Sequence, residues 1–427
     1  MKLINYPQLG EQLFSDVLPS GLNVFVVPKP GYHKKYAFFA TDYGGVDRRF
    51  KLTDNWVDTP AGVAHFLEHK MFDTKDGNAL EILSANGASP NAYTSNDSTA
   101  YHFECIDMFM ENLETLLSFV SVPYFTDESV EKEQGIITQE IRMVEDNPDF
   151  NLYYGLLRSL FKNNPVRDPV AGTIESIKKI TAETLYDCHK VFYAPSNMVL
   201  CVVGDVDPAE VCSLASKILP GQPVVAPHKD YGTLEEHKPE DLVVQKAMEV
   251  SLPIFLAGCK IKPVIRGPES LLYEIVGSLA LEIIFGHSSP FFLRLYSKGL
   301  VNVDFSASFD SAAGVAYTMF GGETREPLRV FNEVTDEIGR LLKDGPDTAL
   351  FDRIKKAAIG GHIRALNSFG IIASSISEGH FRDFDSYKAP EILTKVSIDD
   401  IMNFIRENLI PDNMAISIIN PIDEVMN

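Results

Sequence analysis

Cysteine is scarce in this sequence, and its arrangement excludes a disulfide framework. The 427 residues contain five cysteines, an odd number, and no two of them form a CxxC pair. Disulfide-stapled secreted domains and cysteine-based zinc sites both need paired cysteines at short spacings. The N-terminus also lacks the basic segment and following apolar segment of a secretory signal. We therefore expect reduced thiols and a cytoplasmic location.

Long apolar runs and positive charge are also lacking. No stretch approaches the roughly 18 uninterrupted apolar residues that indicate a transmembrane helix. Lysine and arginine total 38 against 59 aspartates and glutamates, which gives a net charge of −21. Such a charge repels phosphate backbones and anionic membrane surfaces. We therefore expect neither a nucleic-acid partner nor a membrane partner.

The sequence does contain an internal repeat at about half its length. Residues 180–198 align without a gap to residues 396–414, an offset of 216. Each copy begins with a serine or threonine suited to cap a helix, continues as an amphipathic helix, and passes through Pro-x-Asn-Met into an apolar strand. Helix, proline turn and strand often follow one another, but the identical spacing favours duplication over chance.

The repeat predicts an α+β protein of two homologous α/β-sandwich domains, each an antiparallel-rich sheet with helices packed on one face. The chain is too long for one hydrophobic core, and a segment rich in proline, glycine and charge separates its halves. We place the N-terminal domain at 1–218, the linker at 219–241 and the C-terminal domain at 242–427. The expected strands are 21–27, 35–42, 98–105 and 198–206, then 247–259, 302–309, 314–322 and 414–420.

The stretch AGVAHFLEHKMF places ionisable side chains in a run that is otherwise mostly apolar. Thr59 and Pro60 predict the start of a helix, as its N-cap and first residue. On that helix His65 and His69 share a face, at the spacing that lets two imidazoles bind one Zn²⁺. Glu68 lies at the edge of this face, where a carboxylate can take a proton from water.

This order of residues is the inverted zinc-peptidase motif H-x-x-E-H. Chance produces it in roughly one chain in sixty of this composition, so the motif needs support from elsewhere. The alternative is a pair of partly buried histidines beside a surface glutamate. Because buried imidazoles without partners are costly, we favour a metal site.

A catalytic zinc needs a third protein ligand, and a second helix offers two candidates. Residues 125–149 read FTDESVEKEQGIITQEIRMVEDNPD, an amphipathic helix that Thr126 or Asp127 can cap. Glu133 and Glu140 lie seven residues apart, two helical turns, on one face. The spacing alone leaves both open as the third ligand.

Together these residues resemble the pitrilysin/insulinase family of inverted-motif zinc peptidases, or inverzincins. The resemblance rests on His65-x-x-Glu68-His69 and on Glu140 in the phrase EKEQGIITQEIRMVEDNP, and it extends over essentially the whole chain. It is closest to the two-domain branch that includes mitochondrial processing peptidase and its bacterial relatives. The resemblance implies one Zn²⁺ per chain, bound by His65, His69 and Glu140, with Glu68 as general base and Glu133 orienting a ligand. It also implies that only the N-terminal copy binds zinc.

The resemblance further implies a substrate strand. The sequence NGASPNAYTSNDSTAY predicts a hairpin between two turns. By the resemblance, Asn91, Ala92, Tyr93 and Thr94 form an edge strand beside the zinc, to which an extended peptide adds by main-chain hydrogen bonds. On the sequence alone, an ordinary hairpin strand is the commoner meaning.

One part of the family pattern is missing. The C-terminal domain of the family usually carries an arginine and a tyrosine, in a phrase like L-R-x-x-x-G-L-x-Y, that reach the substrate. This chain reads FFLRLYSKGLVNVDF, which places Leu295 and Asn302 at those two positions. Two-subunit members of the family divide these roles, so we expect a homologous partner, in a heterodimer or a homodimer. Alternatively, Arg294 or Tyr296 substitutes within the chain.

The leading hypothesis is therefore a zinc metalloendopeptidase that hydrolyses peptides or unfolded segments, completed by a homologous partner chain. A second hypothesis is a non-catalytic structural or assembly subunit of the same family, although such subunits usually lose motif residues. A third is a protein that binds peptides without metal, and the absence of bound zinc would favour it.

Overall fold

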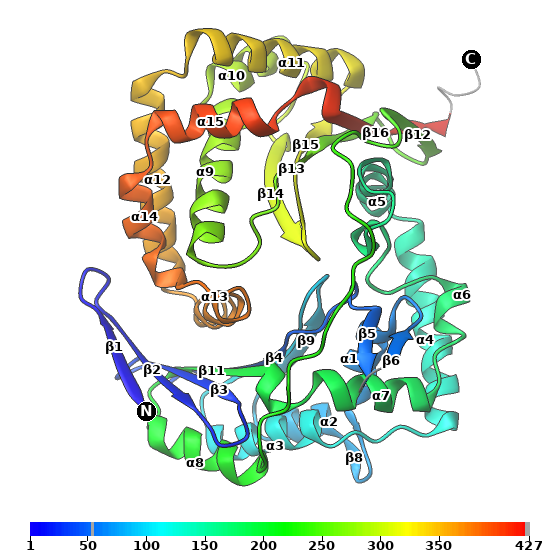
Figure 1. The fold of residues 1–427 in the computed structure, drawn as a ribbon, viewed down its shortest axis with the longest axis vertical. Coiled ribbons are helices and arrows are strands. Elements are labelled where there is room, and N and C mark those ends of the chain that lie inside the picture. Colours follow the sequence, from blue (N-terminus) through cyan, green and yellow to red (C-terminus); the bar gives the residue numbers. More distant parts are fainter. Residues whose placement is uncertain (53–54, 423–427) are drawn as a thin grey trace. The chain divides into compact units, whose positions relative to one another are not determined.

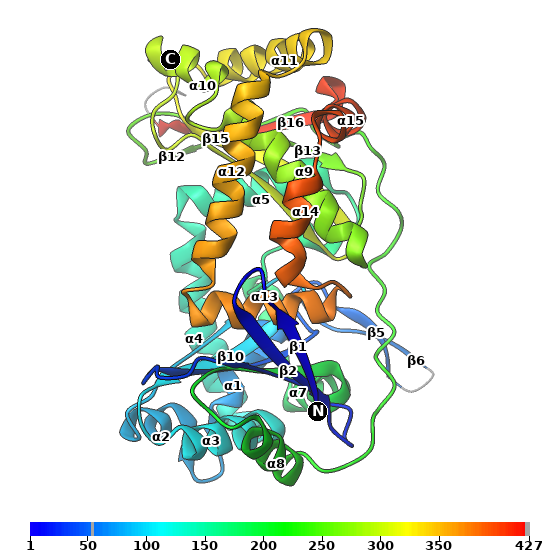
Figure 2. The same ribbon diagram turned by 90° about the vertical axis from the view of Figure 1, so that its left-hand side faces the viewer.

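The computed structural model describes residues 1–52 and 55–422 (Figures 1 and 2). The chain forms two compact units, each built from segments of both halves of the sequence. Unit 1 comprises Met1–Ile141, Pro169–Tyr231 and Ile363–Tyr387, and unit 2 comprises Arg142–Asp168, Gly232–His362 and Lys388–Asn427.

Unit 1 contains a seven-stranded sheet in the order β1-β2-β3-β11-β4-β10-β9. Its central strands β11 and β4 are buried on both faces, and their valine-, phenylalanine- and alanine-rich sequences fit that position. In sheet order, the strands are Lys2–Tyr6, Glu11–Val17, Asn23–Pro28, Met198–Gly204, Lys35–Thr41, Thr99–Cys105 and Ser89–Thr94. Two small hairpins lie outside it: β5 (Arg49–Leu52) with β6 (Asn55–Asp58), and β7 (Asp73–Thr74) with β8 (Gly77–Asn78).

Helices cover both faces of this sheet. Alternation along β11 sends Leu200 and Val202 into the core on one face, and Cys201 and Val203 into the core on the other. The first face carries α1 (Val63–Met71), α2 (Ala79–Ala85), α3 (Phe109–Ser121), α4 (Asp127–Glu145), α6 (Ile174–Ile177), α7 (Ala182–Phe192) and α8 (Pro208–Ile218). The second face is covered by α13 (Phe369–Phe381), which comes from the C-terminal half of the chain (Figure 2).

Unit 2 contains a five-stranded sheet in the order β12-β16-β13-β15-β14. These strands are Val243–Met248, Met414–Pro421, Ile254–Ile261, Val315–Glu323 and Ser306–Ala312. Its helices are α9 (Pro268–Phe285), α10 (Pro290–Ser297), α11 (Pro327–Asp344), α12 (Thr348–Ala365), α14 (Ala389–Lys395) and α15 (Ile398–Asn408). A helix from the N-terminal half, α5 (Pro148–Leu160), packs on β16, β13 and β12 (Figure 1).

The two sheets confirm the duplication, because their strands match in order, direction and register. The order β3-β11-β4-β10-β9 corresponds to β12-β16-β13-β15-β14, and in both sheets only the first pair of strands is parallel. One row of paired residues crosses unit 1 through Met198, Thr41, Thr99 and Thr94. The matching row crosses unit 2 through Met414, Cys259, Thr318 and Phe309. The two methionines that begin these rows are those of the sequence repeat.

The compact units differ from contiguous halves by two exchanged segments. The residues carrying α5 belong to unit 2, and those carrying α13 belong to unit 1. Each helix covers the sheet face that the other helices of its unit leave open. The boundaries at 1–218, 219–241 and 242–427 stay a prediction.

The expected linker forms no helix or named strand, but side chains fasten it at both ends. Lys229 donates to Asp42 and Asp47 within unit 1. Glu235 accepts three backbone N–H groups within unit 2, those of Lys162, Asn163 and Asn164. Although its composition is that of a flexible linker, this segment is therefore held in place by hydrogen bonds.

Residues Pro268–Ser297, which contain α9 and α10, have the length and apolar composition of a membrane-crossing helix. Of the most apolar window in this stretch, 72% is buried inside the protein. Helix α9 packs against β14, α14 and α15 within unit 2. Core packing therefore accounts for its apolar surface.

The expected start of α1 is wrong by three residues. The N–H and hydroxyl of Thr59 both donate to the carbonyl of Arg48, so its side chain does not cap the helix. The helix begins at Val63, after Gly62, whose φ of 97° turns the chain into it. A Cβ on Gly62 would lie 2.6 Å from the carbonyl oxygen of Ala171, so only glycine fits there without a shift.

Two expected strands of unit 2 also have different bounds. The range 247–259 covers the end of β12 and most of β13, because the segment before Pro253 leaves the sheet. The range 302–309 becomes strand only from Ser306. The five cysteines are free and buried, as expected.

Candidate metal centre

Helix α1 presents two histidines at the surface of the core of unit 1. The rings of His65 and His69 are half-buried, and their centroids lie 4.6 Å apart. The opposite side of the helix is anchored by buried apolar side chains: Val63, Phe66, Leu67 and Met71. The position of both imidazoles is therefore fixed by core packing.

Helix α4 brings two glutamates to these histidines. The carboxylate of Glu140 lies 3.5 Å from Nε2 of His65 and 3.7 Å from Nε2 of His69. Glu133, two turns earlier, lies 3.0 Å from Nδ1 of His69 in a hydrogen bond. Buried Val130 and Ile137 hold this stretch of α4 in the core. The two nitrogens of His69 thus face different carboxylates.

The grouping of His65, His69 and Glu140 has the spacing of a metal site. One ligand atom from each residue lies within 4.8 Å of the others. Ligands of a tetrahedral ion bound at about 2.0–2.1 Å stand roughly 3.3 Å apart, close to the distances found here. Within residues 1–52 and 55–422 this is the one such group of histidine, cysteine and carboxylate side chains. Two imidazoles and one carboxylate are a donor set that suits zinc.

The pKa values of Glu140 and His69 are both shifted towards the charged forms. The neighbouring imidazole of His65 lowers the pKa of Glu140, outweighing the effect of burial, and the charge of His69 adds to this. Burial alone would lower the pKa of His69. The hydrogen bond that His69 donates to Glu133 and the negative charges of Glu133 and Glu140 outweigh burial and raise it. The site is therefore rich in negative charge that a bound cation would neutralise.

The carboxylate of Glu68 faces the edge of the sheet. Its Oε2 accepts a hydrogen bond of 2.7 Å from the hydroxyl of Thr94. Thr94 ends β9, which is the edge strand next to β10, and α1 packs against β9. Half-buried Pro90, Ala92 and Thr94 alternate along β9 with the more exposed Asn91 and Tyr93. The structure thus brings Glu68, the histidines and a free strand edge together.

Other histidines that the sequence left without partners have structural surroundings. His102 on β10 stacks on Tyr36 and Phe38. His189 is buried and hydrogen-bonds the carbonyl of Val120. Neither belongs to the group of His65, His69 and Glu140.

The residues of unit 2 that replace the family's arginine and tyrosine are engaged locally. Leu295 is fully buried on α10. Asn302 donates to Asp304 and Glu323. Arg294 lies 3.1 Å from Glu337 in an ion pair. A role for Arg294 at a substrate would break that pair.

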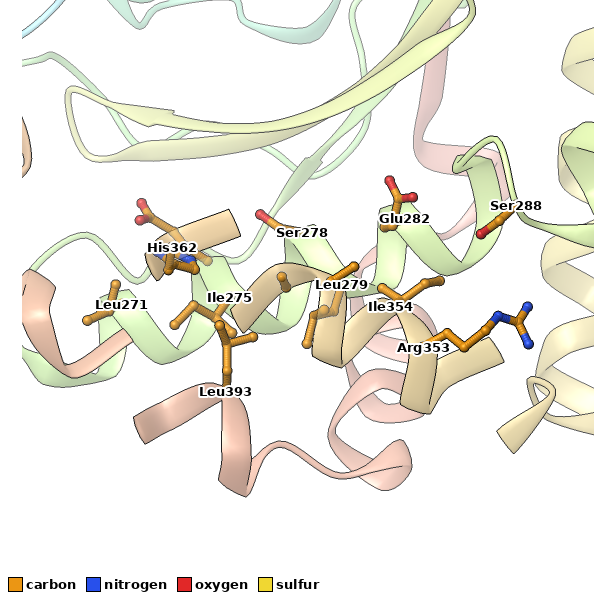
Figure 3. A pocket seen from close by; sticks show the side chains of 13 residues that line it. Leu271, Ile275, Ser278, Leu279, Glu282, Ser288, Arg353, Ile354, His362 and Leu393 are labelled. Atoms are coloured by element: carbon orange, nitrogen blue, oxygen red, sulfur yellow. The ribbon is translucent and has the colours of Figure 1, made fainter. Parts of the chain in front are cut away.

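The second copy of the duplicated fold holds a hollow beside the helices that correspond to α1 and α4. Helices α9 and α12 follow the strands of unit 2 as α1 and α4 follow those of unit 1. Between α9, α12 and α14 lies a hollow of about 560 Å³ (Figure 3). Its lining combines aliphatic with ionisable side chains: Leu271, Ile275, Leu279, Ile354 and Leu393 on the one hand, and Glu274, Glu282, Arg353 and His362 on the other.

The counterpart of the contact between Thr94 and Glu68 is apolar. Phe309, which matches Thr94 in register, lies against Gly277 of α9, where a Cβ would come within 2.4 Å of its ring. No carboxylate fits there. Gly277 therefore provides no counterpart of the hydrogen bond between Thr94 and Glu68.

Comparison with known proteins identifies the family. Residues 57–174 match the model described as Insulinase (Peptidase family M16), and residues 179–358 match that of the Peptidase M16 inactive domain. The chain is 39% identical over 433 residues to uncharacterized zinc protease YmfH of Bacillus subtilis (strain 168), and the match covers 99% of each chain. The chain belongs to peptidase family M16.

Solved structures of M16 proteins share its fold. An M16-like peptidase from Alicyclobacillus acidocaldarius superposes with a TM-score of 0.93 at 32% identity, covering 98% of this chain and 99% of that one. Pitrilysin superposes with a TM-score of 0.78 at 15% identity, over 96% of this chain but 45% of its own. The resemblance to the pitrilysin/insulinase family and the two-domain α/β fold are confirmed.

A hollow that the sequence of this M16 chain does not reveal lies beside His69 and Glu68. It has a volume of about 520 Å³ and is lined by α1, α2, α4, β9 and the residues after α1. These elements are far apart in the sequence, so spacing could not reveal the hollow. The phrase EKEQG does contain two of its lining residues, Lys132 and Glu133.

Proposed function

We propose that this chain is a zinc-dependent endopeptidase acting on peptides or unfolded segments. The observation that carries the proposal is the position of Glu68, between a zinc-type donor set and a free strand edge. Relatives named zinc proteases support a protease role. Without a strand edge beside it, the same donor set would suit a structural metal ion equally well.

In the proposed site, His65, His69 and Glu140 hold one zinc ion. Glu133 accepts the Nδ1 proton of His69, which fixes the ring and leaves Nε2 to bind the metal. A bound zinc ion would polarise the scissile carbonyl and lower the pKa of a water molecule towards neutrality.

Glu68 acts as the general base. Its carboxylate takes a proton from the attacking water and later gives it to the leaving amine. The hydroxyl of Thr94 holds this carboxylate at 2.7 Å and so orients it towards the strand edge. The group that transfers the proton therefore lies next to the strand that binds the substrate.

The substrate adds as an extended strand along Asn91, Ala92, Tyr93 and Thr94. The N–H of Ala92 donates to the side-chain oxygen of Asn91 at 2.9 Å, which indicates that it lies on the free side of β9. A substrate carbonyl can replace that oxygen. Main-chain bonds of this kind bind many sequences, as a peptidase of unfolded segments requires.

The substitution Glu68→Gln tests this proposal. We expect the variant to bind one zinc per chain but to lose cleavage of an unstructured peptide library by at least about a hundredfold, because general-base catalysis contributes 10²–10⁴ in rate. Metal content by mass spectrometry and cleavage by liquid chromatography measure the two effects. Wild-type cleavage by this variant would refute the role of Glu68, and a wild-type chain without zinc affinity would refute the metal site.

We further propose that a homologous partner chain supplies the missing arginine and tyrosine. Arg294 pairs with Glu337, and Leu295 is buried, so neither is free to act as the family's arginine. Pitrilysin is more than twice as long as the part of it that this chain matches. A second chain of the same fold would supply the remaining half.

A further inference from the structure

The hollow beside the proposed metal ligands borders the same strand edge as the substrate. Pro90, Asn91 and Ala92 of β9 line it, together with Glu68 and His69 of α1. A peptide that adds to β9 next to the metal ligands must point one side chain into this hollow, because side chains alternate across a strand. Its volume of about 520 Å³ is that of a ligand-sized pocket.

Six ionisable side chains line the hollow, and five of them already have partners. Glu68 accepts from Thr94, and Glu133 is bonded to His69. The ammonium of Lys70, which is buried, is paired with the carboxylate of Asp73. The six are Glu68, His69, Lys70, Asp73, Lys132 and Glu133.

Lys132 is the remaining ionisable side chain of this set. Its ammonium has no ion pair or hydrogen bond with any residue that the structure describes, and its side chain is exposed on α4. Apolar groups from Phe72, Leu80 and Ile136 line the same hollow and can pack the stem of an entering side chain. The hollow therefore combines an apolar wall with one free positive charge.

We propose that this hollow selects an acidic side chain next to the scissile bond, through Lys132. The inference rests on the proposed function, since it takes β9 as the substrate strand. A glutamate side chain has an apolar stem for the wall and a carboxylate for the ammonium. The preference opposes the net charge of −21, which repels acidic peptides at long range, so it must be local.

The test compares binding of three fluorescent nonapeptides that differ only in a central glutamate, glutamine or lysine. Binding to the zinc-loaded Glu68→Gln chain is measured by fluorescence anisotropy, so that no turnover is needed. We expect the glutamate peptide to bind about fivefold more tightly than the glutamine peptide, the size of an exposed ion pair. In the same background Lys132→Met should remove this ratio, and Lys132→Glu should reverse it in favour of lysine.

A matched control separates local from long-range charge. Lys179→Glu changes the net charge as Lys132→Glu does, but Lys179 is exposed outside the hollow. An equal effect of both substitutions, or no effect of Lys132→Glu, overturns the inference, as does absence of binding by all three peptides. If the chain prefers the glutamate peptide but the wild-type chain cleaves no peptide, the proposed function is refuted. The inference that the hollow binds an acidic side chain is then retained.

Discussion

At the scale of single residues, His189 shows how burial couples this fold to pH. It stacks on Tyr193, and its Nε2 donates to the carbonyl of Val120 at 3.0 Å. Burial lowers its pKa from 6.5 to about 4, with the hydrogen bond opposing the shift. The unfolded chain therefore binds more protons than the folded chain between pH 6.5 and 4. Stability from this group is complete above pH 6.5 and is lost as the pH falls towards 4.

We predict that His189→Gln flattens the acid side of the stability profile. A glutamine amide can still donate to the carbonyl of Val120 but does not titrate. Between pH 7 and pH 5 the wild-type chain should lose about 2 kcal/mol more free energy of unfolding than the variant. Urea unfolding of both chains at pH 5, 6 and 7 measures this difference, in which other titrating groups cancel. Parallel profiles would mean that His189 is not buried in its neutral form.

The sequence alone could not decide whether Glu133 or Glu140 is the third expected metal ligand. Glu133 and Glu140 share a face of α4, so their spacing cannot distinguish them. The distinction depends on which turn of α4 meets which ring nitrogen of His69, and only packing between the helices fixes this. The roles of both glutamates stay predictions until metal binding is measured.

At the scale of elements, the edge strand β9 gives a test that leaves the metal ligands intact. The N–H of Ala92 lies on the free side of the strand, where proline is tolerated. We predict that Ala92→Pro keeps zinc binding and thermal stability close to wild type but weakens peptide binding about fivefold or more, since it removes one main-chain donor. Ala92→Ser keeps that donor and is the control. Unchanged peptide affinity in Ala92→Pro would place the substrate elsewhere.

Most strands could be predicted because their apolar patterns are set by burial in the sheet itself. The expected ranges 35–42 and 98–105 match β4 and β10 closely. The start of α1 could not be predicted, because the cap at Thr59 was overruled by its bonds to Arg48, a residue of another segment. The helix propensity of a local segment carries no information about hydrogen bonds to a distant segment that compete with its capping bonds.

At the scale of the whole molecule, the repeat predicted the duplication but not the exchange of α5 and α13. An amphipathic helix shows that one of its faces is buried, but not against which sheet. Both helices pack on the sheet built by the opposite half of the sequence. The absence of an H-x-x-E-H motif from the second half was visible in the sequence. The hollow between α9, α12 and α14 could be found only in the structure (Figure 3).

The last prediction concerns whether one chain is a complete enzyme. The purified, zinc-loaded chain should cleave peptides slowly, because donors that stabilise the tetrahedral intermediate contribute about 10²–10³ in rate. Adding a homologous chain that carries the Arg and Tyr phrase should raise the rate by about that factor, and the same partner with its arginine changed to alanine should not. Arg294→Ala is the internal control. If it abolishes cleavage by the single chain while Glu337→Gln, which weakens its ion pair, does not, then Arg294 acts within the chain and the partner is unnecessary.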